Sequence, residues 1–309
     1  MDKLKAMSAF VQIVEKGSLT AAADGLDTSL PSIVRTLAAL ERSLGARLLN
    51  RTTRRIALTD EGRAYYEGAR RILGDVADVE AAVSARQGTP RGRLAIGAPV
   101  MFGRLHLAPL VIEFLAKHPQ VSVELLLMDR VVNLVEEGLD TSLRIGSLAD
   151  SSLVAIELGR TRRVVCAAPA FLKRHGVPRQ PADLARMPCI RFTGLALNDW
   201  EFGAGKKTTR VRVEGPIATN QIDAALDACL QGLGCGRFLC YQVAAHQQAG
   251  RLRYVLETHE PEPLPVSLVY PQARLVSARL RAFIDWVVPR MRERLGAGMG
   301  KASQVKRGT

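Results

Sequence analysis

Apolar residues near the N-terminus recur at the spacing of α-helices. The first helix carries one apolar stripe, formed by Leu4, Met7, Phe10, Val11 and Val14. Gly17 is expected to end this helix, because glycine commonly follows a helix C-terminus. Ser18 and Ser29 are of the type that caps helix N-termini, which predicts a short second helix and then a third. The third helix is expected to pack a stripe against the first two, formed by Ile33, Leu37, Leu40 and Leu44.

Polar and basic residues occupy the other face of the third helix and the segment after it. No acidic residue falls between Arg42 and Thr59, whereas five arginines lie in this stretch, counting Arg42 itself. Two short helices, a turn and a basic hairpin predict a winged helix-turn-helix, whose second motif helix enters the major groove while the wing meets phosphates. The residues expected to contact DNA are Ser29, Leu30, Pro31, Ser32, Val34, Arg35 and Thr36 on the helix and Arg51, Thr53, Arg54 and Arg55 on the wing. The alternative is a helical domain whose arginines form only a solvated face.

A long amphipathic helix is predicted from residue 59. Thr59 is a suitable N-cap, and Asp60 and Glu61 in the first turn favour the helix dipole. Apolar residues then alternate at spacings of four and three, a coiled-coil seam formed by Tyr65, Ala69, Ile72, Val76, Val79 and Val83. Such a stripe needs a partner, which is either its own domain or a second copy of the helix. The run from Gly88 to Gly92 is expected to break the helix.

After Gly92 the pattern changes to short apolar runs that alternate with helical segments, which is typical of an α/β sheet domain. The expected strands cover residues 94–98, 121–128, 142–145, 164–168, 210–213 and 265–270, and the expected helices cover residues 107–117, 131–137 and 277–295.

Charge and cysteine usage narrow the classes of function. The 309 residues carry a formal net charge of +13, which favours an anionic partner, either nucleic acid or an acidic membrane surface. A membrane is the weaker choice, because the chain has no run of about 18 apolar residues and its N-terminus lacks the apolar core of a signal peptide. Five cysteines, an odd number, argue against a secreted disulfide framework. We therefore expect a cytoplasmic protein.

Motifs for catalysis, metal binding and cofactor binding are incomplete. Gly203–Lys206 lacks the earlier glycine and the following Ser or Thr of a phosphate loop. Gly232 and Gly234 are not followed by the third glycine of a dinucleotide fingerprint, since Arg237 stands at that position. The five histidines show no metal-ligand spacing, and neither a CxxC pair nor a nucleophile elbow occurs. No enzyme activity, metal or cofactor is expected. Cys235 and Cys240 carry one hypothesis, a reactive thiolate near Arg237, against the alternative of inert buried thiols.

The block from Ser18 to Gly62 resembles the N-terminal domain of LysR-type transcriptional regulators, and the resemblance continues to about residue 290. Three further stretches carry it: Gly92–Pro99 (GRLAIGAP), Leu143–Gly146 (LRIG), and Gly232-Leu233-Gly234 with Leu239–Val243. The resemblance implies an N-terminal all-α winged helix-turn-helix with a long linker helix. It also implies a C-terminal α/β effector-binding domain of two subdomains, like a periplasmic binding protein.

The implied domains are 1–58 for DNA binding, 59–88 for the dimerising linker helix, 89–92 for the hinge, 93–295 for effector binding and 296–309 for a basic, disordered tail. Within the effector domain, subdomain I covers about 93–163 and 266–295, and subdomain II covers about 164–265. Promoter DNA, a small-molecule effector and a second copy of the chain, as a dimer or tetramer, are the implied partners of this bacterial-type regulator. A membrane is not among them.

In open α/β sheets, ligands bind beyond the carboxyl ends of the strands, and the resembled family places its effector there. The positions implied for the effector are Pro99, Val100, Met101, Arg144, Gly146, Trp200 and Asn220.

The sequence departs from the family pattern at two places. Leu30 and Val34 stand where the family commonly has polar residues, and such side chains contact thymine methyl groups rather than hydrogen-bonding bases. Pro99 and Val100 stand near the place where family members often have a hydroxyl side chain, and the absence of this hydroxyl disfavours a simple carboxylate effector. A metabolite-binding module without DNA function and an α/β enzyme are the alternative functions.

Overall fold

The computed structural model describes residues 2–52, 55–83, 89–130, 132–148, 153–193, 199–203, 208–272 and 276–299. The chain divides into two compact units, Met1–Thr89 and Pro90–Thr309. Each unit has hydrophobic clusters of its own, and each is described by itself below.

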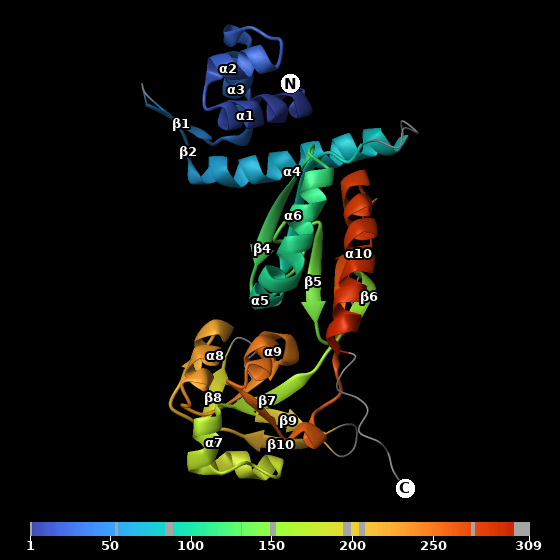
Figure 1. Cartoon of the computed structure of the whole chain (residues 1–309). Helices are drawn as coiled ribbons and strands as arrows, with labels where there is room; N and C mark the ends of the chain where they lie inside the picture. The colour runs from blue at the N-terminus through green and yellow to red at the C-terminus, as the bar shows by residue number, and fades with distance from the viewer. Residues whose placement is uncertain are drawn as a thin grey trace. The chain divides into compact units, whose positions relative to one another are not determined.

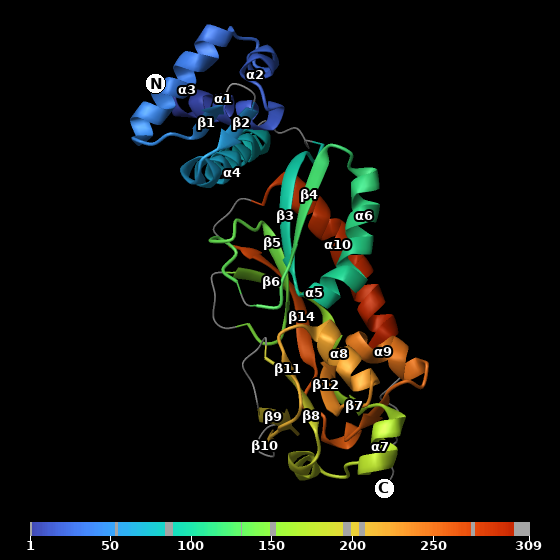
Figure 2. The ribbon, with the colours of Figure 1, turned by 90° about the vertical axis from the view of Figure 1, so that its left-hand side faces the viewer.

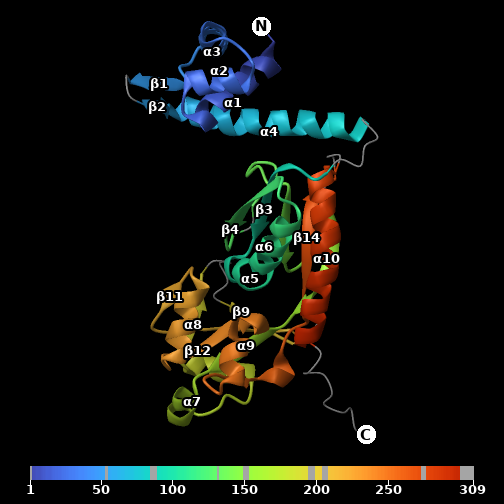
Figure 3. The ribbon, with the colours of Figure 1, turned by 45° about the horizontal axis from the view of Figure 1, so that its top comes forward.

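The first unit consists of helices and one hairpin (Figure 3). Its elements are α1 (Lys3–Lys16), α2 (Leu19–Gly25), α3 (Leu30–Leu44), β1 (Leu49–Thr52), β2 (Arg55–Leu58) and α4 (Asp60–Val83). The caps agree with the sequence prediction: the Ser18 hydroxyl accepts a hydrogen bond from the Ala21 amide, and the Ser29 hydroxyl accepts one from the Ser32 amide. Gly17 ends α1 in the left-handed region, at a φ of 64° that glycine adopts without a steric penalty.

The core of the first unit contains the predicted stripe of α3 with one exception. Ile33, Leu37 and Leu40 are buried together with Phe10 of α1. Leu44, expected in the same stripe, is 43% exposed. It is the last residue of α3, and the chain turns away at Gly45, so Leu48 and Leu49 fill the corresponding part of the core instead.

The junction between the hairpin and α4 is tightly packed. The Thr59 hydroxyl caps α4 by accepting from the Gly62 amide at 2.9 Å and donates to the Arg47 carbonyl at 2.7 Å. The Thr59 amide donates to the Leu48 carbonyl at 3.1 Å. A Cβ at Gly62 would overlap the Leu48 carbonyl oxygen and lie 2.8 Å from its carbon. Only glycine therefore fits at this crossing.

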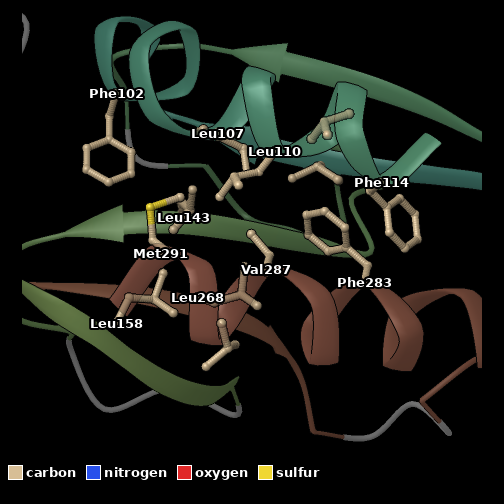
Figure 4. Packing of buried hydrophobic residues seen from close by; sticks show 14 of the residues in the cluster. Phe102, Leu107, Leu110, Phe114, Leu143, Leu158, Leu268, Phe283, Val287 and Met291 are labelled. Atoms are coloured by element: carbon tan, nitrogen blue, oxygen red, sulfur yellow. The ribbon is translucent and has the colours of Figure 1, made fainter. Parts of the chain in front are cut away.

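The second unit contains two five-stranded sheets. The first has the order β4-β3-β5-β14-β6, with β3 parallel to β4 and β5 and β14 antiparallel to β5 and β6. Its strands are β3 (Gly92–Ala98), β4 (Val121–Leu127), β5 (Thr141–Ile145), β6 (Leu153–Thr161) and β14 (Leu264–Pro271). Helices α6 (Ala108–Lys117) and α10 (Ala278–Met299) cover one face (Figure 2). Phe114, Phe283 and Met291 pack there (Figure 4).

The second sheet has the order β11-β8-β12-β7-β13. Its strands are β7 (Arg163–Ala167), β8 (Cys189–Phe192), β11 (Ala218–Thr219), β12 (Cys235–Leu239) and β13 (Arg253–Val255). Alternate residues of β7 enter different clusters: Val164 packs with residues of α8 (Ile222–Leu230) and α9 (Cys240–Gln248), whereas Val165 packs with Trp200 and other residues of the hairpin β9 (Asp199–Phe202) and β10 (Thr209–Arg212). Short helices α7 (Pro169–His175) and η2 (Pro181–Arg186) also cover the latter face.

The chain crosses between the two sheets twice, once from β6 to β7 and once from η4 (Glu257–His259) to β14 (Figure 1). An ion pair joins the two crossings, because Arg162 Nη1 lies 2.9 Å from Glu260 Oε2. Both side chains are mostly buried, where a charged hydrogen bond is stronger than at the surface.

Two predicted elements are wrong in detail. Residues 134–138 form turns rather than part of the helix expected over 131–137. The Asn133 side chain accepts from the Val135 amide at 3.0 Å, a local bond that competes with helix formation. Helix α10 continues to Met299, so the start of the expected disordered tail at 296 is also wrong; residues 300–309 lie outside the described residues.

Candidate functional site

The exposed face of α3 contains the residues that sequence analysis assigned to DNA. Ser29, Leu30, Pro31 and Arg35 are exposed, and Ser32, Val34 and Thr36 are half-buried. None of these side chains belongs to the core cluster that holds Ile33 and Leu37. The start of α3 therefore offers one basic and several small side chains to an external surface. Glu41, on the same helix, accepts from the Leu48 amide at 2.8 Å, so this carboxylate fixes the following turn.

The predicted wing is the hairpin of β1 and β2. The strands pair antiparallel, with Thr52 opposite Arg55. Two residues assigned to DNA, Thr53 and Arg54, lie outside the described residues, as do the side chains of Arg51 and Arg55. The hairpin fold is thus confirmed, and the roles of the four residues stay predictions.

The apolar seam of α4 is divided between two environments. Tyr65 packs against the core of its own unit, with its ring centroid 5.6 Å from that of Phe10. Ala69 is buried and Val76 is half-buried, whereas Ile72 and Val79 are 43% and 49% exposed. The Val83 side chain lies outside the description. Tyr65 therefore follows the alternative interpretation, packing on its own domain, and the seam open to a partner begins at Ile72.

A cavity of about 420 Å³ lies between the two sheets of the second unit. Sequence-predicted residues that line it are Pro99, Arg144, Gly146 and Trp200. Met101 was also expected there, but it is only 3% exposed and packs in the cluster of Val164 and Leu226. Val100 and Asn220 are likewise not among the lining residues. Met101 was misplaced because successive residues of a helix point in different directions, so its side chain turns into the core.

The helix start after Pro99 already holds a carboxylate. Asp129 Oδ1 accepts a hydrogen bond from the Val100 amide at 3.0 Å. Burial raises the pKa of Asp129, while the bond from Val100 opposes this rise. The rule that ligands bind at strand ends also covers Asp129, since this residue follows β4 at the same sheet edge where β3 leads into Pro99. The sequence prediction applied the rule to the ends of β3 and β5 alone.

Arginines from both sheets line the cavity. Arg144 of β5 donates from Nη2 to the Val132 carbonyl at 2.6 Å, and burial lowers the pKa of its guanidinium. Arg163 of β7 and Arg237 of β12 were not assigned to the site by sequence analysis, yet both line the cavity. Their strands are adjacent in the second sheet. This adjacency comes from strand pairing between distant segments, which the sequence pattern did not specify.

An aromatic cluster borders the cavity where α9 meets the helix after β3. Tyr241, which lines the cavity, lies edge-on to Phe102 and His106, with ring centroids 5.2 and 5.4 Å away. Burial, and then the charge of Arg294, lowers the pKa of His106. These contacts join the two subdomains beside the cavity.

The cysteine hypothesis does not fit the environment of Cys235. This thiol is fully buried, and burial raises its pKa, as it raises that of Cys189 to about 12. A thiolate is the reactive form, so the alternative of an inert buried thiol is the better description. Cys240 is half-buried, with its sulfur 3.5 Å from the Thr161 hydroxyl oxygen.

Within the described ranges, no group of three or more His, Cys, Asp or Glu side chains could hold a metal ion. No helix in the same ranges is long and apolar enough to cross a membrane.

Two family models match the chain. One, described as a bacterial regulatory helix-turn-helix protein of the lysR family, matches residues 4–63, and the other, the LysR substrate binding domain, matches residues 87–292. The chain belongs to the LysR family. It is accordingly a transcriptional regulator and not an enzyme, with a DNA-binding helix-turn-helix domain and an effector-binding domain.

Relatives of this LysR-family regulator align along most of its length. An HTH-type transcriptional repressor of Pseudomonas aeruginosa is 35% identical, over 93% of this chain and 92% of the relative. AaeR, an HTH-type transcriptional activator of Escherichia coli, is also 35% identical, over 92% and 93% of the two chains. Among solved structures, CrgA from Neisseria meningitidis, a LysR-type transcriptional regulator, matches with 31% identity and a TM-score of 0.59, covering 93% of this chain and 98% of that one.

Proposed function

We propose that this regulator binds promoter DNA in the cytoplasm as a homodimer, with α3 of each copy in a major groove. The observation that carries this proposal is the exposed start of α3, where Arg35 and the smaller residues lie opposite the buried stripe of Ile33 and Leu37. In helix-turn-helix proteins, this part of the second motif helix contacts base edges. Two copies read two half-sites and double the phosphate contacts. The dimer contact is assigned to the open seam of α4 that begins at Ile72.

Replacing Arg35 with Ala tests this assignment in the full chain. A bidentate contact between arginine and guanine contributes about 1–3 kcal/mol, so the affinity for a specific duplex should fall by about 5- to 150-fold. Arg253→Ala is the matched control, because Arg253 is an exposed arginine of the second unit and its loss changes the net charge equally. Fluorescence anisotropy with labelled DNA measures both. Equal affinities of the two variants would remove Arg35 from the interface.

We further propose that the cavity between the two sheets is the effector site and that occupancy changes the angle between the subdomains. The cavity is lined by both subdomains, so a ligand that contacts both walls has different affinities for open and closed arrangements. The Arg162–Glu260 ion pair holds the two crossings together and provides a fixed point for such a movement. A changed subdomain angle would alter the spacing of the two DNA-binding domains in a dimer and thereby the bend of the promoter.

This coupling is tested by the apparent DNA affinity at saturating effector. By linkage, an effector that changes DNA affinity must bind the DNA complex with an affinity changed by the same factor. Equal effector affinity with and without DNA would refute the coupling while leaving DNA binding in place.

A further inference from the structure

The cavity has a positively charged wall that belongs to the second sheet. Arg163 stands on β7 and Arg237 on β12, and the pairing register sets Leu239 opposite Arg163 and Arg237 opposite Val165. Arg163 and Arg237 are therefore diagonal neighbours on adjacent strands. Diagonal neighbours have their side chains on the same face of the sheet, and long side chains at such positions can reach each other. Both line the cavity, so two guanidinium groups are aimed at one region of it.

The charge of these two arginines is not neutralised by the part of the protein that the structure describes. Across those residues, no ion pair or hydrogen bond joins either guanidinium to a carboxylate. Glu201 is the acidic side chain whose charge acts on both, but its Oε1 lies 2.8 Å from Arg210 Nη2 in an exposed ion pair. Both arginines are half-buried, and two guanidinium groups side by side without a carboxylate form a site for an anion from outside.

The electrostatics of the two arginines support this interpretation. Burial lowers the pKa of Arg163. Burial, and then repulsion from Arg163, lowers the pKa of Arg237 to about 10. Both groups therefore remain charged at neutral pH but hold their charge at a cost. An anion placed between them removes the repulsion and forms charge-assisted hydrogen bonds, which are about twice as strong as neutral ones.

Trp200 fixes the orientation of one of the two guanidinium groups. The Arg237 guanidinium carbon lies 5.4 Å from the centre of the Trp200 ring, and the tryptophan itself is 3% exposed. A guanidinium that lies over an aromatic ring keeps its N–H groups free at the edge of its plane. This arrangement suits a planar, bidentate acceptor such as a carboxylate.

The opposite wall argues against anion binding at the helix start after Pro99. The Val100 amide already donates a hydrogen bond to the Asp129 carboxylate. A second carboxylate at that point would meet the charge of Asp129. The arginine pair of the second sheet is therefore the favoured anchor for an anionic group from outside. The expectation from the sequence, that the missing hydroxyl near Pro99 and Val100 disfavours a simple carboxylate effector, did not include these two arginines.

The rest of the cavity is largely apolar. Its lining includes Ile145, Ile190, Phe192, Ile222, Phe238 and Leu264. Its volume of about 420 Å³ is within the range of sites for small organic ligands. An inorganic anion would satisfy the arginines but leave this apolar surface without a partner.

We infer that the cavity binds a small organic carboxylate with an apolar body, whose carboxylate is held by Arg163 and Arg237. The inference rests on the proposed role of the cavity as the effector site and adds the chemical class of the ligand and the residues that select it.

The test uses matched pairs of an acid and its amide on the full chain: benzoate with benzamide, and 2-naphthoate with 2-naphthamide. Binding is measured by isothermal titration calorimetry, with inorganic phosphate as a further probe. At least one carboxylate should bind at least tenfold more tightly than its amide and than phosphate. Arg163→Gln and Arg237→Gln should each weaken carboxylate binding at least tenfold. Arg212→Gln is the control, since Arg212 is an exposed arginine of β10 outside the cavity, and it should bind as the wild type does.

The thermal midpoint of each variant without ligand shows whether a loss of binding comes from misfolding. Because the two arginines repel each other in the empty cavity, Arg163→Gln should raise the thermal midpoint of the unliganded protein, whereas Arg212→Gln should leave it unchanged. The inference is overturned if no carboxylate binds at millimolar concentration, if the amides bind as tightly as the acids, or if the cavity variants bind like the wild type. Phosphate binding as tight as that of the carboxylates would overturn the requirement for an apolar body. Salt-dependent DNA binding by the same protein samples shows whether such a failure concerns the ligand class alone or the regulator as a whole.

Discussion

Replacing Gly62 with Ala should destabilise the first unit, although alanine is the better helix former. Gly62 is in the first turn of α4, where a Cβ would overlap the Leu48 carbonyl oxygen. That carbonyl accepts from the Thr59 amide, and the Thr59 hydroxyl caps α4, so a shift of the backbone disturbs both bonds. Helix propensity favours Ala by about 1 kcal/mol, whereas overpacking costs about 1–3 kcal/mol and a lost cap about 1 kcal/mol. The balance is a loss of about 1–3 kcal/mol.

Gly68→Ala is the matched control for this substitution. Gly68 lies in the same helix, and a Cβ there meets nothing within 4 Å, so the propensity gain should act alone and raise stability by about 1 kcal/mol. For a unit of this size, each kcal/mol shifts the thermal midpoint by roughly 4–8 °C.

The two variants are compared by thermal melts of the full chain followed by two signals. Both tryptophans, Trp200 and Trp286, belong to the second unit. Fluorescence therefore reports the second unit, and far-UV circular dichroism also reports the helices of the first. Gly62→Ala should lower the circular dichroism midpoint of the first unit and Gly68→Ala should raise it, with fluorescence unchanged. A Gly62→Ala protein as stable as Gly68→Ala would refute the close approach at Leu48.

Three other substitutions or modifications test separate parts of the account. Ile72→Glu places a charge on the open seam of α4 and should shift the protein toward a monomer in sedimentation velocity; an unchanged mass would place the dimer contact elsewhere. Because burial lowers the pKa of His106, the folded state disfavours its protonation, so this residue's contribution to stability is present above about pH 6.5 and is lost as the pH falls. His106→Gln should therefore flatten the decline of the melting temperature between pH 7 and 5, and an identical decline in both proteins would contradict this role. Cys240 is the half-buried member of the five cysteines, so a thiol reagent should modify about one thiol in the native protein and all five after unfolding; rapid modification of Cys235 would restore the redox hypothesis.

Local sequence signals located the helices of the first unit. Each helix N-cap accepts a hydrogen bond from the amide three residues later, as Ser18, Ser29 and Thr59 do. The rules for caps therefore locate the helix starts directly. Gly17 and Gly45 mark helix ends because they adopt positive φ. Leu44 was misassigned because the pattern of a stripe does not say where the last turn leaves the core.

Predicting the residues that line the cavity required information on tertiary contacts, which local sequence patterns do not contain. Of the residues that the family resemblance implied for the effector, Pro99, Arg144, Gly146 and Trp200 line the cavity. Arg163 and Arg237 meet only because β7 and β12 pair across a long stretch of chain. Asp129 was missed although it follows a strand, since its role depends on the helix start that it reaches. Strand pairing between distant segments thus supplied two of the positive charges that line the cavity.

The central claim, a dimeric regulator that reads specific DNA through α3, is tested most directly by titrating the full chain against the DNA upstream of its own gene. The titration is repeated across salt concentrations with random duplex as the competitor. The account predicts binding at least about 10³-fold tighter than to random DNA. It also predicts a log affinity that falls linearly with log salt, by about 0.9 per neutralised phosphate, and weaker specific binding by Arg35→Ala. Equal affinity for both duplexes at every salt concentration, with Arg35→Ala unchanged, would contradict it.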